Sequence, residues 1–420
     1  MVAIHPFRAL RYNPDVVGDL SRVIAPPYDV IGSQEQDALY AASPFNIVRL
    51  ILGKTSASDS DQDNRYTRAA RDFDQWRKQE ALRVDAQPAL YVIEHRFQDG
   101  GETRSRLGFL GLFELRDAAR DVHRHEVTLS APKQDRTKLL EAIPANLSPI
   151  FCVFPDEGRT VQAVLERVKS DAPAAVEAVL QQQPIRLWAV TDPATIASIT
   201  KPLASRAVLI ADGHHRFEVA YAQRERYGAL MSYFVSMEDP ALRVRPIHRI
   251  IARGAGNPAL MKTFCRLEPA DDADAVLRWL NAGTEEGRFG YLEGRACYQA
   301  TILPDRLARW LMSPPMPLPV AKLDVSILHG LILPGLGVPA SAAHTGSEGA
   351  AVRYTGDAAE AVKAVSEGHA AWLLRGIPLT QVYALAAHGM TLSPKSTYFY
   401  PKVPSGLAIN PLTPAAPGQD

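Results

Sequence analysis

Residues 207–217 read AVLIADGHHRF, and this stretch indicates how the central part of the chain folds. The apolar run at residues 207–210 predicts a buried strand, and apolar side chains recur at helical spacing from Phe217 onward. Asp212 and Gly213, between the two, supply the turn. The stretch therefore predicts a strand–turn–helix unit, the arrangement at which α/β folds bind phosphate groups.

The first turn of this helix carries three potential cations, His214, His215 and Arg216. Unpaired amides give a helix N-terminus partial positive charge, so these side chains lower stability unless an anion lies among them. A phosphate is the expected anion. In the alternative interpretation, Asp212 caps the helix, Gly213 forms the turn and the histidines are solvated. Metal binding by the two histidines is a weaker option, because adjacent side chains on a helix point about 100° apart.

Composition and charge indicate a globular protein with small-molecule partners. The chain has 420 residues, enough for two or three domains, and 46 basic residues balance 46 acidic ones. This balance, without a helix-turn-helix pattern, argues against nucleic acid as a partner. The three cysteines are far apart and form no CxxC pair, which favours a reducing compartment. No window of about eighteen apolar residues predicts a membrane span, so we expect a cytoplasmic location.

The pattern along the chain predicts a mixed α/β fold in three parts. Residues 1–119 form an N-terminal α/β segment packed on a core, residues 120–251 form that core, and residues 258–410 form a C-terminal α/β domain. Small residues and a proline at 252–258 predict the linker before the last domain. The expected strands are residues 45–52, 90–97, 103–115, 150–154, 187–190, 207–211, 297–303 and 371–374. The expected helices are residues 66–82, 132–143, 160–169, 174–183, 273–280, 325–331, 358–366 and 380–388.

A second polar cluster lies just before and at the start of the expected helix at 132–143. Its members are His123, His125, Glu126, Thr128, Lys133, Asp135 and Arg136. Glu126 is the candidate general base, because a carboxylate accepts a proton from a hydroxyl when burial raises its pKa toward the working pH. His123 and His125 share one face of an extended segment, but no third metal ligand is evident nearby. In the alternative interpretation, Asp135 and Arg136 form a surface pair and Lys133 is solvated.

A third cluster, residues 394–402, reads PKSTYFYPK. A lysine followed by two hydroxyl side chains is typical of phosphate binding, but the glycine-rich approach of a P-loop is missing. A strand with Tyr398 and Tyr400 on one face explains the aromatic residues without a functional role. His329 lies among apolar residues at helical spacing, which favours a packed helix over a ligand site.

Seven motifs in matching order show that the chain resembles, over nearly its whole length, the bacterial family called domain of unknown function 1015. The motifs are IHPFRALRYNP, APPYDVI, HEVT, KQDR, ADGHHRF, LDVSILH and KSTYFYPK. The central part is also similar to the ParB/sulfiredoxin superfamily, and within it to free-serine kinases, which carry a His-Glu element upstream of an Asp-Gly-His-His-Arg element. The resemblance implies a ParB/sulfiredoxin-like core with an N-terminal extension and a separate C-terminal α/β domain.

The same resemblance implies magnesium-dependent phosphoryl transfer between a nucleotide, ATP or ADP, and a small hydroxylated metabolite such as serine or phosphoserine. When the roles of the matching kinase residues are carried over to this chain, Glu126 is the base with His125 beside it. Asp212 is then a catalytic residue that also binds Mg²⁺. The implied cofactor-binding residues are Gly213, His214, His215 and Arg216. The expected substrate-binding residues are Thr128, Lys133 and Arg136.

Two other functions stay open at this point. The same residues could hydrolyse a phosphoserine-like monoester with water as the acceptor, or the chain could be a non-catalytic nucleotide-binding switch or adaptor. Sulfiredoxin-like chemistry is disfavoured, because it needs a cysteine in the turn where this chain has histidine. A homodimer is compatible with the sequence, which does not fix the oligomeric state.

Overall fold

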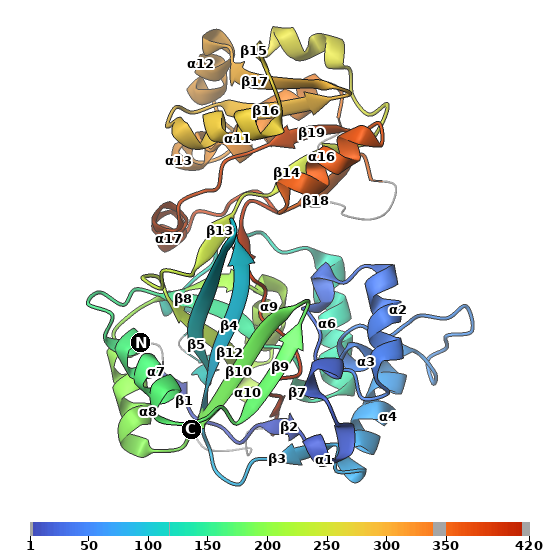
Figure 1. The fold of residues 1–420 in the computed structure, drawn as a ribbon, viewed down its shortest axis with the longest axis vertical. Coiled ribbons are helices and arrows are strands. Elements are labelled where there is room, and N and C mark those ends of the chain that lie inside the picture. The colour runs from blue at the N-terminus through green and yellow to red at the C-terminus, as the bar shows by residue number, and fades with distance from the viewer. Residues whose placement is uncertain (1–2, 117, 339–349, 414–420) are drawn as a thin grey trace. The chain divides into compact units, whose positions relative to one another are not determined.

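The structure is a computed structural model that describes residues 3–116, 118–338 and 350–413 (Figure 1). Contacts among these residues form two compact units. Unit 1 consists of Met1–His123, Thr128–Leu242 and Pro401–Asp420, and unit 2 of Arg124–Val127 and Arg243–Tyr400. Both units mix helices and strands, so the predicted α/β class is confirmed. Within the predicted C-terminal domain, residues 339–349 lie outside the described residues.

Unit 1 is organised around one mixed sheet that combines strands from the predicted segments 1–119 and 120–251. Within the described residues this sheet has nine strands in the order β6-β11-β8-β12-β5-β4-β10-β9, with β1 paired on β5. β11 runs parallel to β6, and β12 runs parallel to β8. The strands are β1 (Ile4–His5), β4 (Leu90–Asp99), β5 (Glu102–Glu114), β6 (Val122–His123), β8 (Ile150–Phe154), β9 (Val176–Leu180), β10 (Gln183–Val190), β11 (Val208–Asp212) and β12 (Ala229–Ser236).

Helices and two short strand pairs complete unit 1. The pairs are β2 (Leu10–Tyr12) with β3 (Leu82–Val84), and β7 (Ala145–Asn146) with β21 (Asn410–Pro411). The helices are α1 (Pro14–Val17), α2 (Ser33–Ala42), α3 (Val48–Ile51), α4 (Arg65–Lys78), α5 (Ala118–Asp121), α6 (Ser130–Ala142), α7 (Thr160–Asp171), α8 (Pro193–Thr200), α9 (His214–Ala222) and α10 (Arg224–Tyr227).

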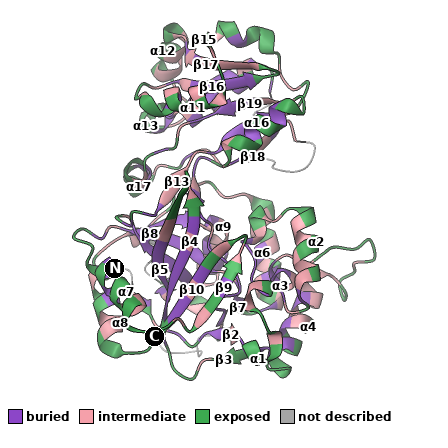
Figure 2. Cartoon of the chain, viewed as in Figure 1, coloured by how far each residue is buried: buried purple, intermediate pink, exposed green. Residues whose placement is uncertain are grey.

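The core of unit 1 forms where helices cover the sheet. Leu165 of α7, Ile199 of α8 and Phe217 of α9 join Phe109 and Phe234 of the sheet in one buried cluster. The central strands of the sheet are accordingly buried, whereas the edge strand β9 and the outer helix faces are largely exposed (Figure 2). Full burial of such a side chain contributes about 1.5–3 kcal/mol, so this packing fixes the position of the β11–α9 connection.

The predicted strand at residues 45–52 is wrong, because this segment contains the helix α3. The side chain of Asn46 explains the difference: its oxygen accepts from the Val48 amide at 2.9 Å, and its Nδ2 donates to the Arg22 carbonyl at 2.8 Å. Val48, Leu50 and Ile51 are buried in this helix. A short apolar run by itself does not separate a strand from a buried helix.

The predicted helix at residues 174–183 is also wrong, because β9 and β10 form a hairpin there. Gln181 and Gln182 have φ values of 49° and 63°, the left-handed conformation that a tight two-residue hairpin turn requires. Asn-Gly or Asp-Gly usually marks such a turn. Glutamine gives no such signal, and the polar composition of the segment suggested an exposed helix instead.

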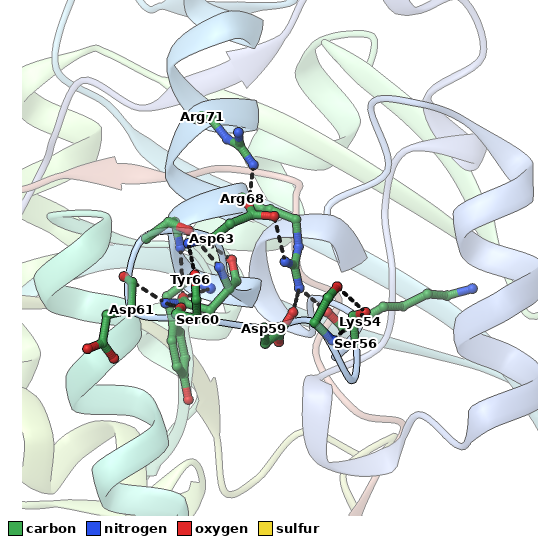
Figure 3. Close-up of polar contacts among 12 residues, drawn as sticks. Lys54, Ser56, Asp59, Ser60, Asp61, Asp63, Tyr66, Arg68 and Arg71 are labelled. Carbon is green, nitrogen blue, oxygen red and sulfur yellow. Dashed lines mark hydrogen bonds and ion pairs between the residues drawn. The ribbon is translucent and has the colours of Figure 1, made fainter.

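The polar loop before α4 is ordered by its own side chains (Figure 3). Asn64 accepts from the amide of Thr67, and Thr67 Oγ1 accepts from the amide of Asn64, which is a capping box. Arg68 and Arg71 on α4 pair with acidic residues of the loop. Tyr66, in the first turn of α4, donates to Asp135 of α6 at 2.7 Å. Tyr66 therefore joins α4 to α6, the helix that carries the predicted substrate residues Lys133 and Arg136.

Unit 2 contains, in its described part, a six-stranded sheet in the order β15-β17-β16-β19-β14-β18 and a separate pair, β13 with β20. The predicted linker at 252–258 follows β14 inside this unit. The strands are β13 (Arg243–Arg245), β14 (His248–Ile251), β15 (Cys265–Ala270), β16 (Arg288–Glu293), β17 (Ala296–Ile302), β18 (Val352–Thr355), β19 (Ala370–Leu373) and β20 (Tyr398–Tyr400). The helices are α11 (Ala273–Ala282), α12 (Pro304–Met312), α13 (Leu318–Ala321), α14 (Asp324–Ile327), a π-helical turn (Leu328–Ile332), α15 (Leu333–Gly335), α16 (Ala358–Ser366) and α17 (Leu379–Ala387).

Both faces of the unit 2 sheet are buried. Ile251 and Trp372 belong to one apolar cluster, while their strand neighbours Ile250 and Ala371 belong to another. Successive side chains of a strand point to opposite faces, so this alternation places one cluster on each side. The second cluster includes α11 and α16, and the first includes the helices at residues 324–335.

Candidate functional site

The predicted strand–turn–helix unit is present as β11, Gly213 and α9. Gly213 has a φ of 94°, a left-handed conformation that favours glycine. A Cβ atom there would lie 2.9 Å from Ile150 Cγ2 and 3.0 Å from Arg216 Nη2. The turn therefore needs glycine for both its conformation and its close packing.

The carboxylate of Asp212 lies between two cations of unit 1. Arg216 Nη2 donates to Oδ2 at 2.7 Å, and Lys402 Nζ donates to Oδ1. The three side chains are only 11–13% exposed. Burial alone would raise the pKa of Asp212, but Lys402 and Arg216 outweigh it and lower that pKa to about 2. Asp212 is therefore ionised at neutral pH.

This arrangement changes the interpretation of the cationic helix start. The sequence predicted an external anion among His214, His215 and Arg216, whereas Asp212 supplies one from the chain itself. Two cations therefore face this single carboxylate. Arg216 also donates through Nη1 to the carbonyl of Pro149, which fixes the guanidinium beside the turn.

The segment after the HEVT motif is held on α9. The Leu129 amide donates to His215 Nε2 at 2.9 Å, so this ring nitrogen is an acceptor and carries no proton. Thr128 Oγ1 and Lys133 Nζ donate to Glu218 at 2.7 and 3.0 Å. Two of the predicted substrate residues thus contact the helix that carries the predicted phosphate residues.

Arg136, the third predicted substrate residue, is 8% exposed and has partners within unit 1. Its guanidinium donates to Asp135 and to the Ile51 carbonyl, and it lies 3.8 Å from the centre of the Tyr28 ring. A cavity of about 70 Å³ between α6 and α9 is lined by both Arg136 and Arg216. The remaining lining is mostly apolar.

His125 and Glu126 belong to unit 2, whereas the turn at 212–216 belongs to unit 1. His125 is fully buried, with Nε2 at 2.9 Å from Thr397 Oγ1, and its carbonyl accepts from the Leu392 amide at 2.7 Å. Glu126 forms a parallel bridge with Leu392. The structure therefore defines the surroundings of the candidate base within unit 2.

Asp212 is the carboxylate of this turn that would hold Mg²⁺ as a single protein ligand. Within the residues that the structure describes, no group of three His, Cys, Asp or Glu side chains could hold a metal by itself. Mg²⁺ at nucleotide sites usually takes one or two carboxylates, and phosphate oxygens and waters complete its shell. Both oxygens of Asp212 accept from cations, so a metal would share or replace one of these contacts.

Lys402 is the site residue that the sequence did not single out. It ends the KSTYFYPK motif, in which the sequence pattern indicated Lys395 and the two hydroxyl residues after it as the phosphate-binding group. In the structure Lys395 has a φ of 58° and belongs to unit 2, whereas Lys402 reaches Asp212 in unit 1. The presence of a second lysine in the motif was the one sequence feature that could have indicated Lys402.

A family model described as "Protein of unknown function (DUF1015)" matches residues 4–326. The chain belongs to this family. No curated protein matches this DUF1015 chain. None of its described helices has the length and apolar character needed to cross a bilayer.

Solved structures similar to this DUF1015 protein include a free serine kinase in complex with AMP. It has 12% identity and a TM-score of 0.37, with 72% of this chain and 90% of the kinase covered. A conserved hypothetical protein from Pyrococcus furiosus has 12% identity and a TM-score of 0.36, over 71% of this chain and 94% of that one. SbnI with C-terminal truncation from Staphylococcus aureus has 10% identity and a TM-score of 0.38, over 72% and 87%. Because the identities and TM-scores are this low, these structures do not indicate the function of this chain.

Proposed function

We propose that unit 1 binds the phosphate groups of a nucleotide at the turn 212–216 and supports phosphoryl transfer to a small hydroxylated metabolite. The observation that carries the proposal is the buried pair of cations, Arg216 and Lys402, on one carboxylate at the start of α9. Cations and helix amides at a strand-to-helix turn are the usual elements of a phosphate site.

Two cations and the start of a helix favour phosphate at this site. Arg216 and Lys402 lie at the turn, and the N-terminus of α9 adds partial positive charge. Phosphate oxygens would be attracted to these groups. Because these side chains are only 12–13% exposed, water screens the attraction less than it would at the surface.

Mg²⁺, when bound by Asp212, would neutralise charge on the phosphate oxygens. The residues of the chain supply the remaining functions. Arg216 and Lys402 would hold phosphate oxygens, and His214 and His215 belong to the same turn. The nucleotide is ATP or ADP, as the motif resemblance implies.

Glu126 is proposed as the base that removes the proton from the acceptor hydroxyl. The assignment follows from the motif resemblance, which implies that the glutamate of the His-Glu element activates the acceptor hydroxyl. Serine or phosphoserine is the proposed metabolite, and its carboxylate would be bound by Lys133 or Arg136, which would then exchange their present acidic partners.

The direct test measures nucleotide binding by the full chain with and without Mg²⁺, using calorimetry. We expect Arg216→Ala and Lys402→Ala each to weaken ADP binding at least ten-fold, because each removes a charged phosphate contact. Arg71→Ala is the matched control, since Arg71 pairs with Asp63 at the surface of the same unit. Equal affinity in wild type and both site variants would refute the phosphate site.

Assays with serine and with phosphoserine as substrates identify the reaction. Conversion of serine with nucleotide to phosphoserine supports transfer. Phosphate release from phosphoserine without nucleotide would instead identify a phosphatase. Nucleotide binding without any product would identify a switch or adaptor.

A further inference from the structure

Unit 2 contains a buried cation that lies outside the proposed nucleotide site. Arg249, on β14, is 1% exposed. Its Nε donates to His329 Nε2 at 2.7 Å, its Nη2 donates to the Lys395 carbonyl at 2.9 Å, and its Nη1 donates to the Ile247 carbonyl. All three acceptors are neutral, because His329 accepts through a nitrogen without a proton.

No carboxylate of the described residues lies within ion-pair distance of Arg249, and its guanidinium lies 5.4 Å from the centre of the Tyr354 ring. Burial lowers the pKa of Arg249 to about 10, so the group still carries its charge at neutral pH. A buried charge without an opposite charge is unfavourable unless a ligand or other polar groups compensate it. Each terminal nitrogen of the guanidinium also carries a second N–H beyond the one used here.

Arg249 lines a cavity of about 570 Å³ in unit 2. The other charged residues of its wall are paired: Arg375 with Asp324 at 2.6 Å and Lys322 with Glu286 at 3.4 Å. The cavity wall therefore has an excess of one positive charge, which belongs to Arg249. The volume is sufficient for a small metabolite.

Two sequence motifs contribute to this cavity residues that the proposed function does not use. Leu323, Asp324 and Val325 come from LDVSILH, and Ser396 comes from KSTYFYPK. His329 and Lys395, from the same motifs, hold the guanidinium of Arg249. The chain thus positions Arg249 with residues that lie about 80 and 146 positions away in sequence.

We propose that this cavity binds a small metabolite with a single carboxylate, which Arg249 recognises. One uncompensated positive charge matches a monoanion, whereas a phosphate dianion would leave negative charge in excess. A planar guanidinium and a carboxylate also match in hydrogen-bond geometry. This site is separate from the nucleotide site of unit 1 and does not depend on it.

The test is calorimetric binding of pyruvate, L-lactate and inorganic phosphate to the full chain. We expect saturable binding of a carboxylate probe, weakened at least ten-fold by Arg249→Gln. Because Arg249 is buried and its variant could fail to fold, Thr284→Trp is the second variant. Thr284 is exposed at the cavity rim, so the larger side chain should block entry without disturbing the core.

Lys402→Ala distinguishes this site from the one in unit 1. Retained carboxylate binding in Lys402→Ala, with loss in Thr284→Trp, supports the proposal. Three results would overturn it: no carboxylate probe binds the wild type, phosphate binds more tightly than every carboxylate, or Thr284→Trp binds as the wild type does. Loss of nucleotide binding in Lys402→Ala concerns only the function proposed above.

Discussion

Lys402 Nζ donates to the Asp212 carboxylate although 190 positions separate the two residues in sequence. The contact fixes the C-terminal segment of unit 1 at the strand-to-helix turn. Arg216 occupies the other carboxylate oxygen. Asp212 thus both neutralises the helix start and holds two groups that the proposed function assigns to phosphate binding.

Replacing Asp212 with asparagine should lower the free energy of unfolding by about 2 kcal/mol at pH 7. The folded pKa of about 2 lies below the value of about 3.9 in an unfolded chain, and each pKa unit corresponds to about 1.4 kcal/mol. Urea unfolding at pH 7 measures the difference. Asp37→Asn, at an exposed ion pair with Lys54, is the control and should change stability by less than about 1 kcal/mol.

The same pKa predicts a pH window. Because the folded pKa is depressed, the stabilisation is complete above about pH 4 and disappears as the pH falls to about 2. The difference between wild type and Asp212→Asn should therefore shrink across that interval. A difference that stays constant between pH 5 and pH 2.5 would contradict the assigned ion pairs.

Gly213→Ala should destabilise unit 1 by about 2 kcal/mol or more. The left-handed φ of 94° is unfavourable for alanine, and its Cβ would contact Ile150 and Arg216 at 3.0 Å or less. Gly228→Ala separates the two causes, because Gly228 also has a positive φ but open space around its Cβ position. Thermal unfolding should show the larger loss for Gly213→Ala, and equal losses would exclude the steric contribution.

Glu218→Gln should loosen the segment that follows the HEVT motif. Glu218 accepts from Thr128 and Lys133, and the amide cannot form the ion pair with the lysine. We expect a loss of about 0.5–1.5 kcal/mol and faster amide hydrogen exchange in residues 128–133. Glu225→Gln, at a largely exposed side chain on α10, should leave that exchange unchanged. Exchange rates that do not differ between the two variants would argue against this anchoring role.

Local patterns predicted the centre of the site because its signals are local. Four apolar residues, a glycine and a helical repeat lie within the stretch 207–217, and the structure forms β11 and α9 there. The segments 45–52 and 174–183 failed for a related reason. Their conformations depend on the side-chain contacts of Asn46 and on an unusual turn at Gln181 and Gln182, which periodicity does not encode.

Long-range contacts of the site were not predictable from spacing. Nothing in the sequence near Asp212 indicates that Lys402 neutralises it, and motif order alone did not separate Lys402 from Lys395. The sequence also did not indicate which unit the residues around the HEVT motif belong to. Arg124–Val127 belong to unit 2 although both flanking segments belong to unit 1, because His125 is buried against Thr397.

The base assignment depends on one kinetic result. Glu126→Gln keeps the size of the side chain and removes its ability to accept a proton, so turnover in the proposed reaction should fall roughly 100-fold. Nucleotide affinity should stay within about two-fold of wild type, since the phosphate contacts belong to unit 1. Glu166→Gln, on the half-exposed side chain of α7, is the matched control. If Glu126→Gln turns over at the wild-type rate, Glu126 is not the base. If nucleotide affinity falls as well, Glu126 contributes to binding, and the hydroxyl proton has another acceptor.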